Sequence, residues 1–379
     1  MSVTSGLLLC QDSPYLTEAS AAVLTCAPEG AGYAVLLDTA LLYPEGGGQP
    51  SDHGTVAGLP VRALRKTADG VVHLLDAPVS GQVAVQLDWA RRFDHMQQHT
   101  GQHLLSALAR DRFGLPTLAF HLGPERSDVE LGGNPTEAQL TALEEAINAV
   151  IREARPIAAR VVSPSELATL DVRSRGLPEG FSGDVRLIEI AGIDLNTCGG
   201  THLANTAEIG ALKLLGTERL TRGLRLFFAA GGRVLRGYEA SLQREVALCR
   251  ALSTTPDGIL AAVERLLADA KAQGKALKAQ SRELATLLGA ALEPDADGVA
   301  RLHRPDGDLA FLGAVADAAR QRRPELPVLL TAGEREGVFL LSGPEAWVST
   351  EGPRIAERLQ GRGGGRGRYQ GKAARVDLR

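Results

Sequence analysis

The stretch FDHMQQHTGQHLLSALARDRFG, residues 93–114, carries apolar side chains near helical spacing and ends in a glycine. It predicts one amphipathic helix. His99 and His103 stand four residues apart, so both side chains project from the same helical face. His95 and His99 are an equally spaced pair, and position alone does not choose between the two pairs. Two leucines follow His103, and a ligand at the edge of a buried face is easier to hold, which favours His103.

A second pair of ligand-type side chains lies in NTCGGTHL, residues 196–203. Cys198 and His202 are also four apart, in a glycine-bearing stretch that predicts a loop able to fold around an ion. Three imidazoles and one thiolate make up the four tetrahedral N/S ligands that zinc prefers. Either pair alone is more often an ordinary surface or core feature. Together they predict one zinc site.

A glycine-rich segment, LYPEGGGQPSDHG, spans residues 42–54. Three successive glycines exclude a helix or a strand interior and predict a loop in which the backbone can approach another group closely. The loop is either a long hairpin turn or a segment that faces a site. The glycines are Gly46, Gly47 and Gly48, and the polar residues beside them are Glu45, Gln49 and Asp52.

The 379 residues suffice for two or three domains, and the pattern predicts an α+β multidomain protein. Short alternating runs separated by turn residues predict a small β-barrel over residues 1–90. Helical and extended segments predict an α+β domain over 91–235, with one helix capped by Thr136. Charges and leucines in near-heptad spacing predict two long helices, a coiled-coil-like arm, over 236–292. Short strands and a helix predict a small α/β domain over 293–379.

The chain ends in GRGGGRGRYQGKAARVDLR, residues 361–379. A flexible, glycine-rich, basic tail is suited to binding phosphate backbones, and the alternative is a solvated disordered end. The candidate phosphate-binding residues are Arg362, Arg366, Arg368 and Lys372.

Composition narrows the function. The formal net charge of -4 gives no global basic signal, so any nucleic-acid surface has to be a local patch. No apolar run reaches the roughly eighteen residues of a membrane span, and no signal peptide is predicted at the N-terminus. The four cysteines lie far apart in unlike contexts, which favours a reducing, cytoplasmic compartment over a disulfide framework.

These motifs resemble those of the freestanding alanyl-tRNA editing proteins, the AlaX group, and of the editing half of alanyl-tRNA synthetase. YPEGGGQPSDHG resembles their glycine-rich motif, DHMQQHTGQHLL their first metal motif and LNTCGGTHLANTAEIG their second, in the same order. LSTTPDGILAAVERLL is similar to the connecting helices of the synthetase, and GRGGGRGRYQGKA to the end of its C-terminal domain. The resemblance covers nearly the whole chain. It implies that the Zn²⁺ ligands are His99, His103, Cys198 and His202.

The resemblance also implies a function. We expect a hydrolase that acts in trans on mischarged Ser-tRNA(Ala), with Gly-tRNA(Ala) as a further candidate substrate. A synthetase has a large ATP-binding core before its editing unit, whereas residues 1–90 are predicted to be β, so no aminoacylation is expected. The C-terminal part is expected to bind tRNA and to form a homodimer. A pocket shaped for alanine cannot strongly exclude glycine or serine, so a second, hydrolytic site is chemically sensible.

Polar residues near the predicted ligands are the candidate catalytic residues. Four protein ligands leave no open position on zinc, so the metal either orders the pocket or loses a ligand and activates water, and the sequence leaves both open. A zinc peptidase would place Glu directly after the first histidine, where this chain has threonine. A non-catalytic tRNA- or RNA-binding protein with a structural zinc is the remaining alternative. The candidate catalytic residues are Gln102, His121, Thr100 and Thr201.

Overall fold

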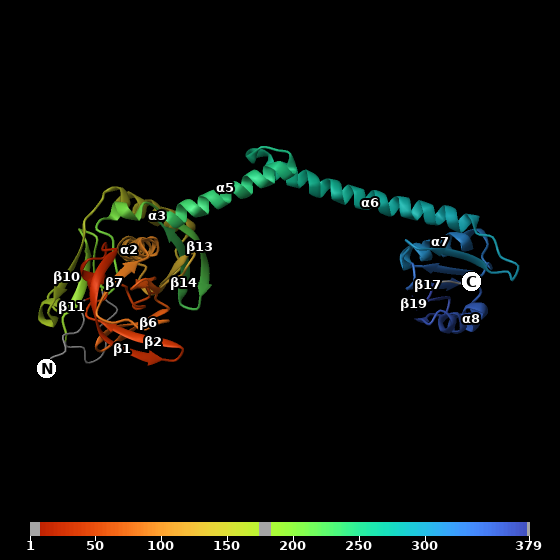
Figure 1. Cartoon of the computed structure of the whole chain (residues 1–379). Coiled ribbons are helices and arrows are strands. Elements are labelled where there is room, and N and C mark those ends of the chain that lie inside the picture. The colour runs from red at the N-terminus through yellow and green to blue at the C-terminus, as the bar shows by residue number, and fades with distance from the viewer. Residues whose placement is uncertain (1–7, 174–182, 377–379) are drawn as a thin grey trace. The chain divides into compact units, whose positions relative to one another are not determined.

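The computed structural model describes residues 8–173 and 183–376. The chain divides into two compact units, Met1–Arg244 and Glu245–Arg379, which are described separately (Figure 1). Both units mix helices and strands, so the predicted α+β multidomain class is confirmed. The finer division at residues 90, 235 and 292 stays a prediction.

The first unit contains a seven-stranded antiparallel sheet in the order β4-β3-β7-β1-β2-β6-β5. It is an open, curled half-barrel with β4 and β5 at its edges, where the sequence predicted a small β-barrel. Pro60 in β4 has no N–H to donate, which suits an edge strand. The strands are β1 (Glu18–Glu29), β2 (Gly32–Leu37), β3 (Gly54–Val56), β4 (Leu59–Pro60), β5 (Ala63–Thr67), β6 (Gly70–Leu75) and β7 (Gln82–Leu87).

Two smaller antiparallel sheets complete the first unit, in the orders β13-β14-β9-β8 and β10-β11-β12. The short helices of this unit are α1 (Leu9–Asp12), α4 (Pro164–Leu167) and the 3₁₀ helix η1 (Thr206–Ile209). The strands are β8 (Thr117–Leu122), β9 (Ser127–Leu131), β10 (Ile157–Val162), β11 (Val185–Ile190), β12 (Asp194–Thr197), β13 (Leu212–Leu220) and β14 (Gly223–Ala230).

Helix α2 (Trp89–Phe113) is the predicted helix, and it contacts strands of both smaller sheets (Figure 1). The Asp88 side chain caps its N-terminus, and the helix ends directly before Gly114, as predicted. Helix α3 (Glu137–Arg152) packs against α2 and begins with a capping box at Thr136, as predicted. The largest core of the unit lies between α2, α3 and the four-stranded sheet.

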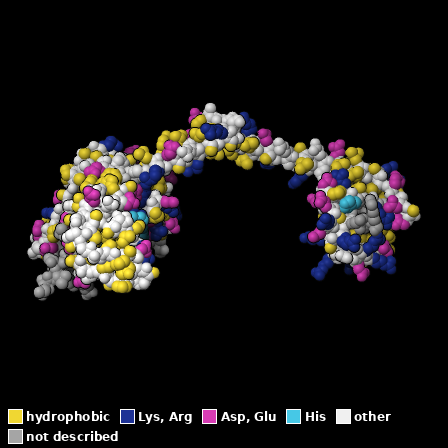
Figure 2. Space-filling model, in the orientation of Figure 1, with side chains coloured by type: hydrophobic (Ala, Val, Ile, Leu, Met, Phe, Trp, Pro, Cys, Tyr) yellow, Lys and Arg dark blue, Asp and Glu magenta, His cyan; other side chains and the backbone are white. Residues whose placement is uncertain are grey.

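Two long helices, α5 (Gly232–Leu252) and α6 (Ile259–Ala291), confirm the helical arm in this region. The short 3₁₀ helix η2 (Pro256–Gly258) separates them within the predicted break. Many leucines along both helices are exposed (Figure 2). Their pairing in a coiled coil stays a prediction. In the described residues no single helix is long and apolar enough to span a membrane; α5 and residues 256–291 meet that test only as a pair bent by 64°.

The second unit has a five-stranded sheet in the order β15-β16-β17-β19-β18, in which only β15 and β16 run parallel. Alternate residues of β17 point to opposite faces, so Leu340 packs in the core beside α7 (Leu309–Arg322) and Phe339 in the core beside α8 (Glu345–Arg358). This arrangement agrees with the small α/β domain expected here. The strands are β15 (Ala300–Arg304), β16 (Val328–Ala332), β17 (Gly337–Ser342), β18 (Arg362–Gly364) and β19 (Arg368–Ala373).

The prediction of a flexible basic tail is wrong for the part that the structure describes. Residues 362–364 and 368–373 form β18 and β19, and β19 pairs with β17 inside the sheet. The glycines serve close strand packing, because a Cβ on Gly371 would lie 2.0 Å from the Arg362 carbonyl oxygen. Residues 377–379 of the predicted tail lie outside the described residues.

His73 on β6 makes the stability of the first unit sensitive to acid. Its side chain is buried between Val35 and Leu64 on the neighbouring strands. Burial lowers its pKa to about 4, against an ordinary value of 6.5. The unfolded chain therefore takes up a proton near pH 6.5, whereas the folded chain does so only near pH 4. The stability contributed by neutral His73 is complete above pH 6.5 and is lost as the pH falls through this window.

We predict that His73→Leu removes part of this acid sensitivity. Between pH 7 and pH 5 the parent should lose about 2 kcal/mol more unfolding free energy than the variant, for a pKa shift of this size. Urea unfolding followed by Trp89 fluorescence, in a Trp347→Phe background, measures the first unit alone. An identical loss in both proteins would contradict the prediction.

Candidate metal centre and adjoining cavity

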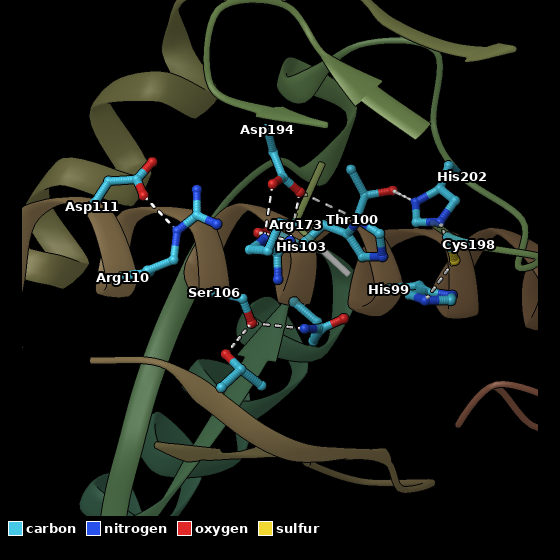
Figure 3. Close-up of polar contacts among 12 residues, drawn as sticks. His99, Thr100, His103, Ser106, Arg110, Asp111, Arg173, Asp194, Cys198 and His202 are labelled. Atoms are coloured by element: carbon cyan, nitrogen blue, oxygen red, sulfur yellow. Dashed lines mark hydrogen bonds and ion pairs between the residues drawn. The ribbon is translucent and has the colours of Figure 1, made fainter. Parts of the chain in front are cut away.

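Four side chains from two distant segments converge in the first unit. His99 and His103 project from α2, while Cys198 and His202 lie in the loop after β12. Their ligand atoms all lie within 4.8 Å of one another. Cys198 Sγ is 3.4 Å from His99 Nε2 and 3.2 Å from His202 Nε2. Two ligands on one tetrahedral ion with zinc-like bond lengths stand about 3.5 Å apart, so the cluster fits a metal ion (Figure 3).

The glycine-rich loop orients His99. Gln49 is fully buried, and its Oε1 accepts hydrogen bonds from His99 Nδ1 at 2.9 Å and from the Thr201 backbone N–H at 3.0 Å. Its Nε2 donates to Thr201 Oγ1 at 2.9 Å. Because Nδ1 donates, Nε2 of His99 keeps its lone pair for an ion. Of the two interpretations of this loop, these contacts favour the segment that faces a site, and its functional role stays a prediction.

Close packing between the loop and the cluster also requires glycine at one position. A Cβ on Gly200 would lie 2.3 Å from His99 Cε1 and 2.8 Å from Gln49 Oε1. The predicted loop glycines serve different contacts: Gly46 forms a bridge with Gln49, Gly47 lines the cavity described below, and Gly48 packs against an aromatic ring on β8.

The other two imidazoles have partners of their own. His202 Nδ1 lies 3.2 Å from Thr100 Oγ1, which leaves Nε2 for the cluster. His103 Nδ1 lies 3.6 Å from Asp194 Oδ2, an ion-pair separation rather than a hydrogen bond. Arg173 holds the buried Asp194 carboxylate, with Nε donating to Oδ1 at 2.8 Å (Figure 3). Each imidazole therefore meets a polar oxygen outside the cluster, which fixes its ring orientation.

The electrostatics favour the forms that bind metals. Burial alone would raise the pKa of the Cys198 thiol, but the three imidazoles outweigh it and hold that pKa well below its ordinary value. Burial lowers the pKa of His202 to about 3, although Cys198 opposes this effect. A thiolate at Cys198 and a neutral imidazole at His202 are forms that a metal ion requires. At His103 burial is outweighed by Cys198 and Asp194, which raise the pKa of that imidazole.

A cavity of about 620 Å³ adjoins the cluster. Gln102 in its wall is buried, and its Nε2 donates to Ser106 Oγ at 2.7 Å. Thr117 Oγ1 donates to the same Ser106 oxygen, also at 2.7 Å. The Gln102 Oε1 atom is buried and has no hydrogen-bond partner among the described residues. Because Gln102 lines the cavity, this unpartnered oxygen is a candidate acceptor for a group bound there. Candidate metal-binding residues, other polar residues and apolar residues all line the cavity. They include His99, His103, Cys198, Arg110, Arg173, Asn196, Pro116, Phe120 and Val172.

The four candidate catalytic residues lie in different surroundings. Gln102 lines the cavity. Thr100 contacts the candidate ligand His202, and Thr201 contacts Gln49, which orients His99. Both threonines therefore support the cluster. His121 is exposed, and its Nδ1 lies 3.0 Å from Asp128 Oδ2 across the β8–β9 hairpin. The catalytic roles of all four stay predictions.

The structure decides between the two histidine pairs on α2. His95 is buried away from the cluster, and burial lowers its pKa to about 4. Its Nδ1 has no partner in the part of the chain that the structure describes. The pair that joins Cys198 is His99 and His103.

Sequence analysis missed three residues that support the cluster. Asp194 and Arg173 position His103 as described above. Arg186 Nη1 donates to the carbonyls of Cys198 and Gly200, each at 2.9 Å, and so holds the metal loop. A carboxylate four residues before a cysteine ligand was a usable signal for Asp194. The arginines carried no such signal, because strand pairing brings them to their partners. Arg186 lies on β11, which pairs with β12, and Arg173 forms an isolated bridge with Asn196 on β12.

Comparisons with known proteins agree with this site. Residues 185–227, which include Cys198 and His202, match the family model of the threonyl and alanyl tRNA synthetase second additional domain. The alanyl-tRNA editing protein Aarsd1 of Danio rerio is 40% identical over 385 residues, which cover 96% of this chain and 93% of that protein. The chain belongs to the alanyl-tRNA editing protein family. The expected resemblance is thereby confirmed.

Two further relatives are an editing protein that is similar over nearly its whole length and a ligase that is similar over a part of its length. Aarsd1 of Mus musculus is 38% identical over 393 residues, covering 98% of this chain and 95% of that protein. The alanine–tRNA ligase of Ignicoccus hospitalis is 34% identical over 274 residues, but these cover 68% of this chain and only 30% of the ligase. The similarity to ligases is thus limited to a part of their length.

We predict that His103→Ala and Cys198→Ala each abolish stoichiometric metal binding, because each removes one of four ligands. Asp194→Asn should keep the metal but weaken its affinity roughly 10- to 100-fold, because His103 loses the carboxylate that orients it. Metal analysis after gel filtration and competition with a chromophoric chelator measure the two effects.

His121→Ala is the matched control for this prediction, since it removes an exposed imidazole outside the cluster. Full metal occupancy in both ligand variants, or an unchanged affinity in Asp194→Asn, would contradict the assignment.

Proposed function

We propose that this chain is an aminoacyl-tRNA deacylase that hydrolyses the ester of Ser-tRNA(Ala) in trans, with Gly-tRNA(Ala) as a further candidate substrate. Membership of the alanyl-tRNA editing family supports the substrate class. The cavity beside the metal cluster supports the location of the reaction, because its volume of about 620 Å³ suits an aminoacyl-adenosine end rather than a macromolecule.

One observation carries the preference for serine. Gln102 lines the cavity, and its buried Oε1 has no partner among the described residues. A seryl hydroxyl can donate to this oxygen, whereas the methyl group of alanine leaves it unpaired at a desolvation cost. A site built to hydrogen-bond a hydroxyl rejects the analogue that lacks it far better than an apolar pocket rejects an extra group. Ser106 and Thr117 hold Gln102 in place for this contact.

We propose Zn²⁺ as the ion of the cluster, on its three imidazoles and one thiolate. When bound, zinc supplies a fixed positive charge at one end of the cavity and orders the loop that carries Cys198 and His202. With four protein ligands present, ordering is the role that we favour over direct activation of water. The residues of the chain then position the substrate: Gln102 binds the aminoacyl group, and Gln49 and Asp194 keep the ligand rings aligned.

The trans-acting role includes an absence of charging activity. The chain aligns with only 30% of the length of the Ignicoccus hospitalis ligase, which supports this proposal. A thiolate ligand is best preserved under reducing conditions, and we therefore place the protein in the cytoplasm.

We predict that the zinc-loaded chain deacylates Ser-tRNA(Ala) at least tenfold faster than Ala-tRNA(Ala), measured as kcat/KM, and charges no tRNA with ATP and alanine. Gln102→Met should lower the ratio of the two kcat/KM values about tenfold, because it removes the acceptor and keeps the side-chain length. Release of labelled amino acid from each tRNA measures both rates.

Arg112→Gln, at an exposed arginine in the last turn of α2, is the control and should leave the ratio unchanged. Equal rates on the two substrates in the parent would refute the proposed function. An unchanged ratio in Gln102→Met would refute the role of that residue. Binding of tRNA without hydrolysis would instead favour a non-catalytic RNA-binding protein with a structural zinc.

We further propose that the second unit contributes tRNA affinity through the basic residues of β18 and β19. Lys and Arg side chains lie on the face of this unit drawn in Figure 2. Arg362 and Lys372 stand directly opposite each other on the two strands and are exposed, as is Arg366 in the turn. Arg368 differs because it pairs with Asp317 on α7. A homodimer through residues 293–379 also stays a proposal, which sedimentation addresses.

We predict that the double variant Arg362→Gln with Lys372→Gln weakens tRNA binding and lowers the slope of log affinity against log salt by up to about 2, since two phosphate contacts are lost. Arg368→Gln should change the slope less, because Asp317 already neutralises that charge. Filter binding between 50 and 200 mM salt measures the slopes. Equal slopes in the parent and the double variant would remove these residues from the tRNA surface.

A further inference from the structure

Arg110 lies in the wall of the same cavity that holds the metal cluster. His99, His103, Ser106 and Arg110 follow one another at four, three and four residues, so they form one stripe along α2. Figure 3 shows Arg110 on the same helix as His103, toward its C-terminal end. Seven residues of helix place the two Cα atoms about 10 Å apart along the axis. The cavity wall therefore carries both the candidate metal cluster and, further along α2, the guanidinium of Arg110.

The two arginines of the cavity differ in what holds them. Arg173 is largely buried, pairs with Asp194 and donates to the carbonyl of His103, so its donors are occupied by structure. Among the described residues Arg110 forms an ion pair with its sequence neighbour Asp111 alone, at 2.7 Å, and the two side chains are 42% and 46% exposed. The carboxylates of Asp194 and Asp171 act on its charge from a greater distance. An exposed pair of this kind contributes about 0–1 kcal/mol and exchanges readily for a stronger anion.

We propose that Arg110 binds the phosphate of the terminal nucleotide of the substrate while the aminoacyl ester lies at the metal cluster. This inference rests on the proposed function, because it identifies the second anchor of that substrate in the same cavity. A phosphate can accept two parallel charge-assisted hydrogen bonds from a guanidinium, whereas Asp111 accepts one from Arg110, at Nε. The separation along α2 is comparable with the length of one nucleotide plus an extended arginine side chain.

Two anchors on one rigid helix have a chemical consequence. A nucleotide held at its phosphate and at its aminoacyl end can move little within the cavity, and such positioning lowers the barrier of the chemical step. Binding energy from the phosphate, remote from the ester, would thus place the ester bond against the cluster. Arg110 is a positioning residue in this account.

The test separates the phosphate from the rest of the substrate. The probes are adenosine carrying serine through a non-hydrolysable 3′-amide, and the same compound with a 5′-phosphate. Calorimetry on the zinc-loaded full chain gives both affinities. In the parent the 5′-phosphate should tighten binding about tenfold, in line with a charge-assisted contact. In Arg110→Gln that gain should fall below about twofold, and Arg110→Lys should keep part of it.

Arg112→Gln is the matched control. Arg112 is an exposed arginine in the same last turn of α2, nine residues from His103 and so on the opposite side of the helix. Both arginines lie where a positive charge interacts favourably with the C-terminal end of the helix dipole. Arg110→Gln and Arg112→Gln should therefore lose the same amount of stability. We expect Arg112→Gln to keep the full tenfold gain, and the metal content of each variant checks its fold.

The outcomes separate the inference from the proposed function. A full phosphate gain in both Arg110 variants, no gain in the parent, or no binding of either probe would overturn the role of Arg110. If the parent deacylates Ser-tRNA(Ala) in these cases, only the inference is wrong. An Arg110-dependent gain in a parent that hydrolyses no Ser-tRNA(Ala) would keep the phosphate site and reject the reaction.

Discussion

Helix α2 is buried along most of its length, although many of its buried side chains are polar. Burying such groups without partners would cost several kcal/mol, so the surrounding elements have to supply hydrogen bonds. Arg92 and Asp52 form a fully buried ion pair between α2 and the glycine-rich loop. The Gln98 amide bonds both the N–H and the carbonyl of Ala230 on β14, at 2.9 and 2.8 Å. His99 and His103 are the part of this polar helix for which a metal ion could be the remaining partner.

This constraint explains which parts of the site the sequence could predict. Residues four apart on a helix share a face whatever surrounds them, so His99 and His103 were predictable from spacing. The choice against His95 was not, because it depends on which side of α2 meets the loop of Cys198. The resemblance to the editing family supplied that choice in advance, and the contacts of Gln49 and Asp194 supply its physical reason.

The errors also have physical causes. A glycine-rich basic segment has the same composition whether it forms a flexible tail or a strand packed closely against its neighbours. Residues 362–364 and 368–373 form such strands. The curled sheet was predicted from alternation, but its edges depend on strand pairing, which a local pattern does not encode. The 12-residue strand β1, which joins the two halves of that sheet, carries small residues and a weak alternation.

The charge of the site follows from the same buried helix. A divalent ion with one thiolate and three neutral imidazoles keeps one positive charge, while the buried pair of Asp194 and Arg173 is neutral overall. With such an ion bound, the cavity would be locally cationic in a chain whose formal charge is -4, and Arg110 at its wall is paired with Asp111. The substrate proposed here is a polyanion that carries an ester at its end. A small cationic cavity on an otherwise acidic chain would attract the end of such a molecule, and in the function proposed above the exposed basic residues of the second unit bind the rest.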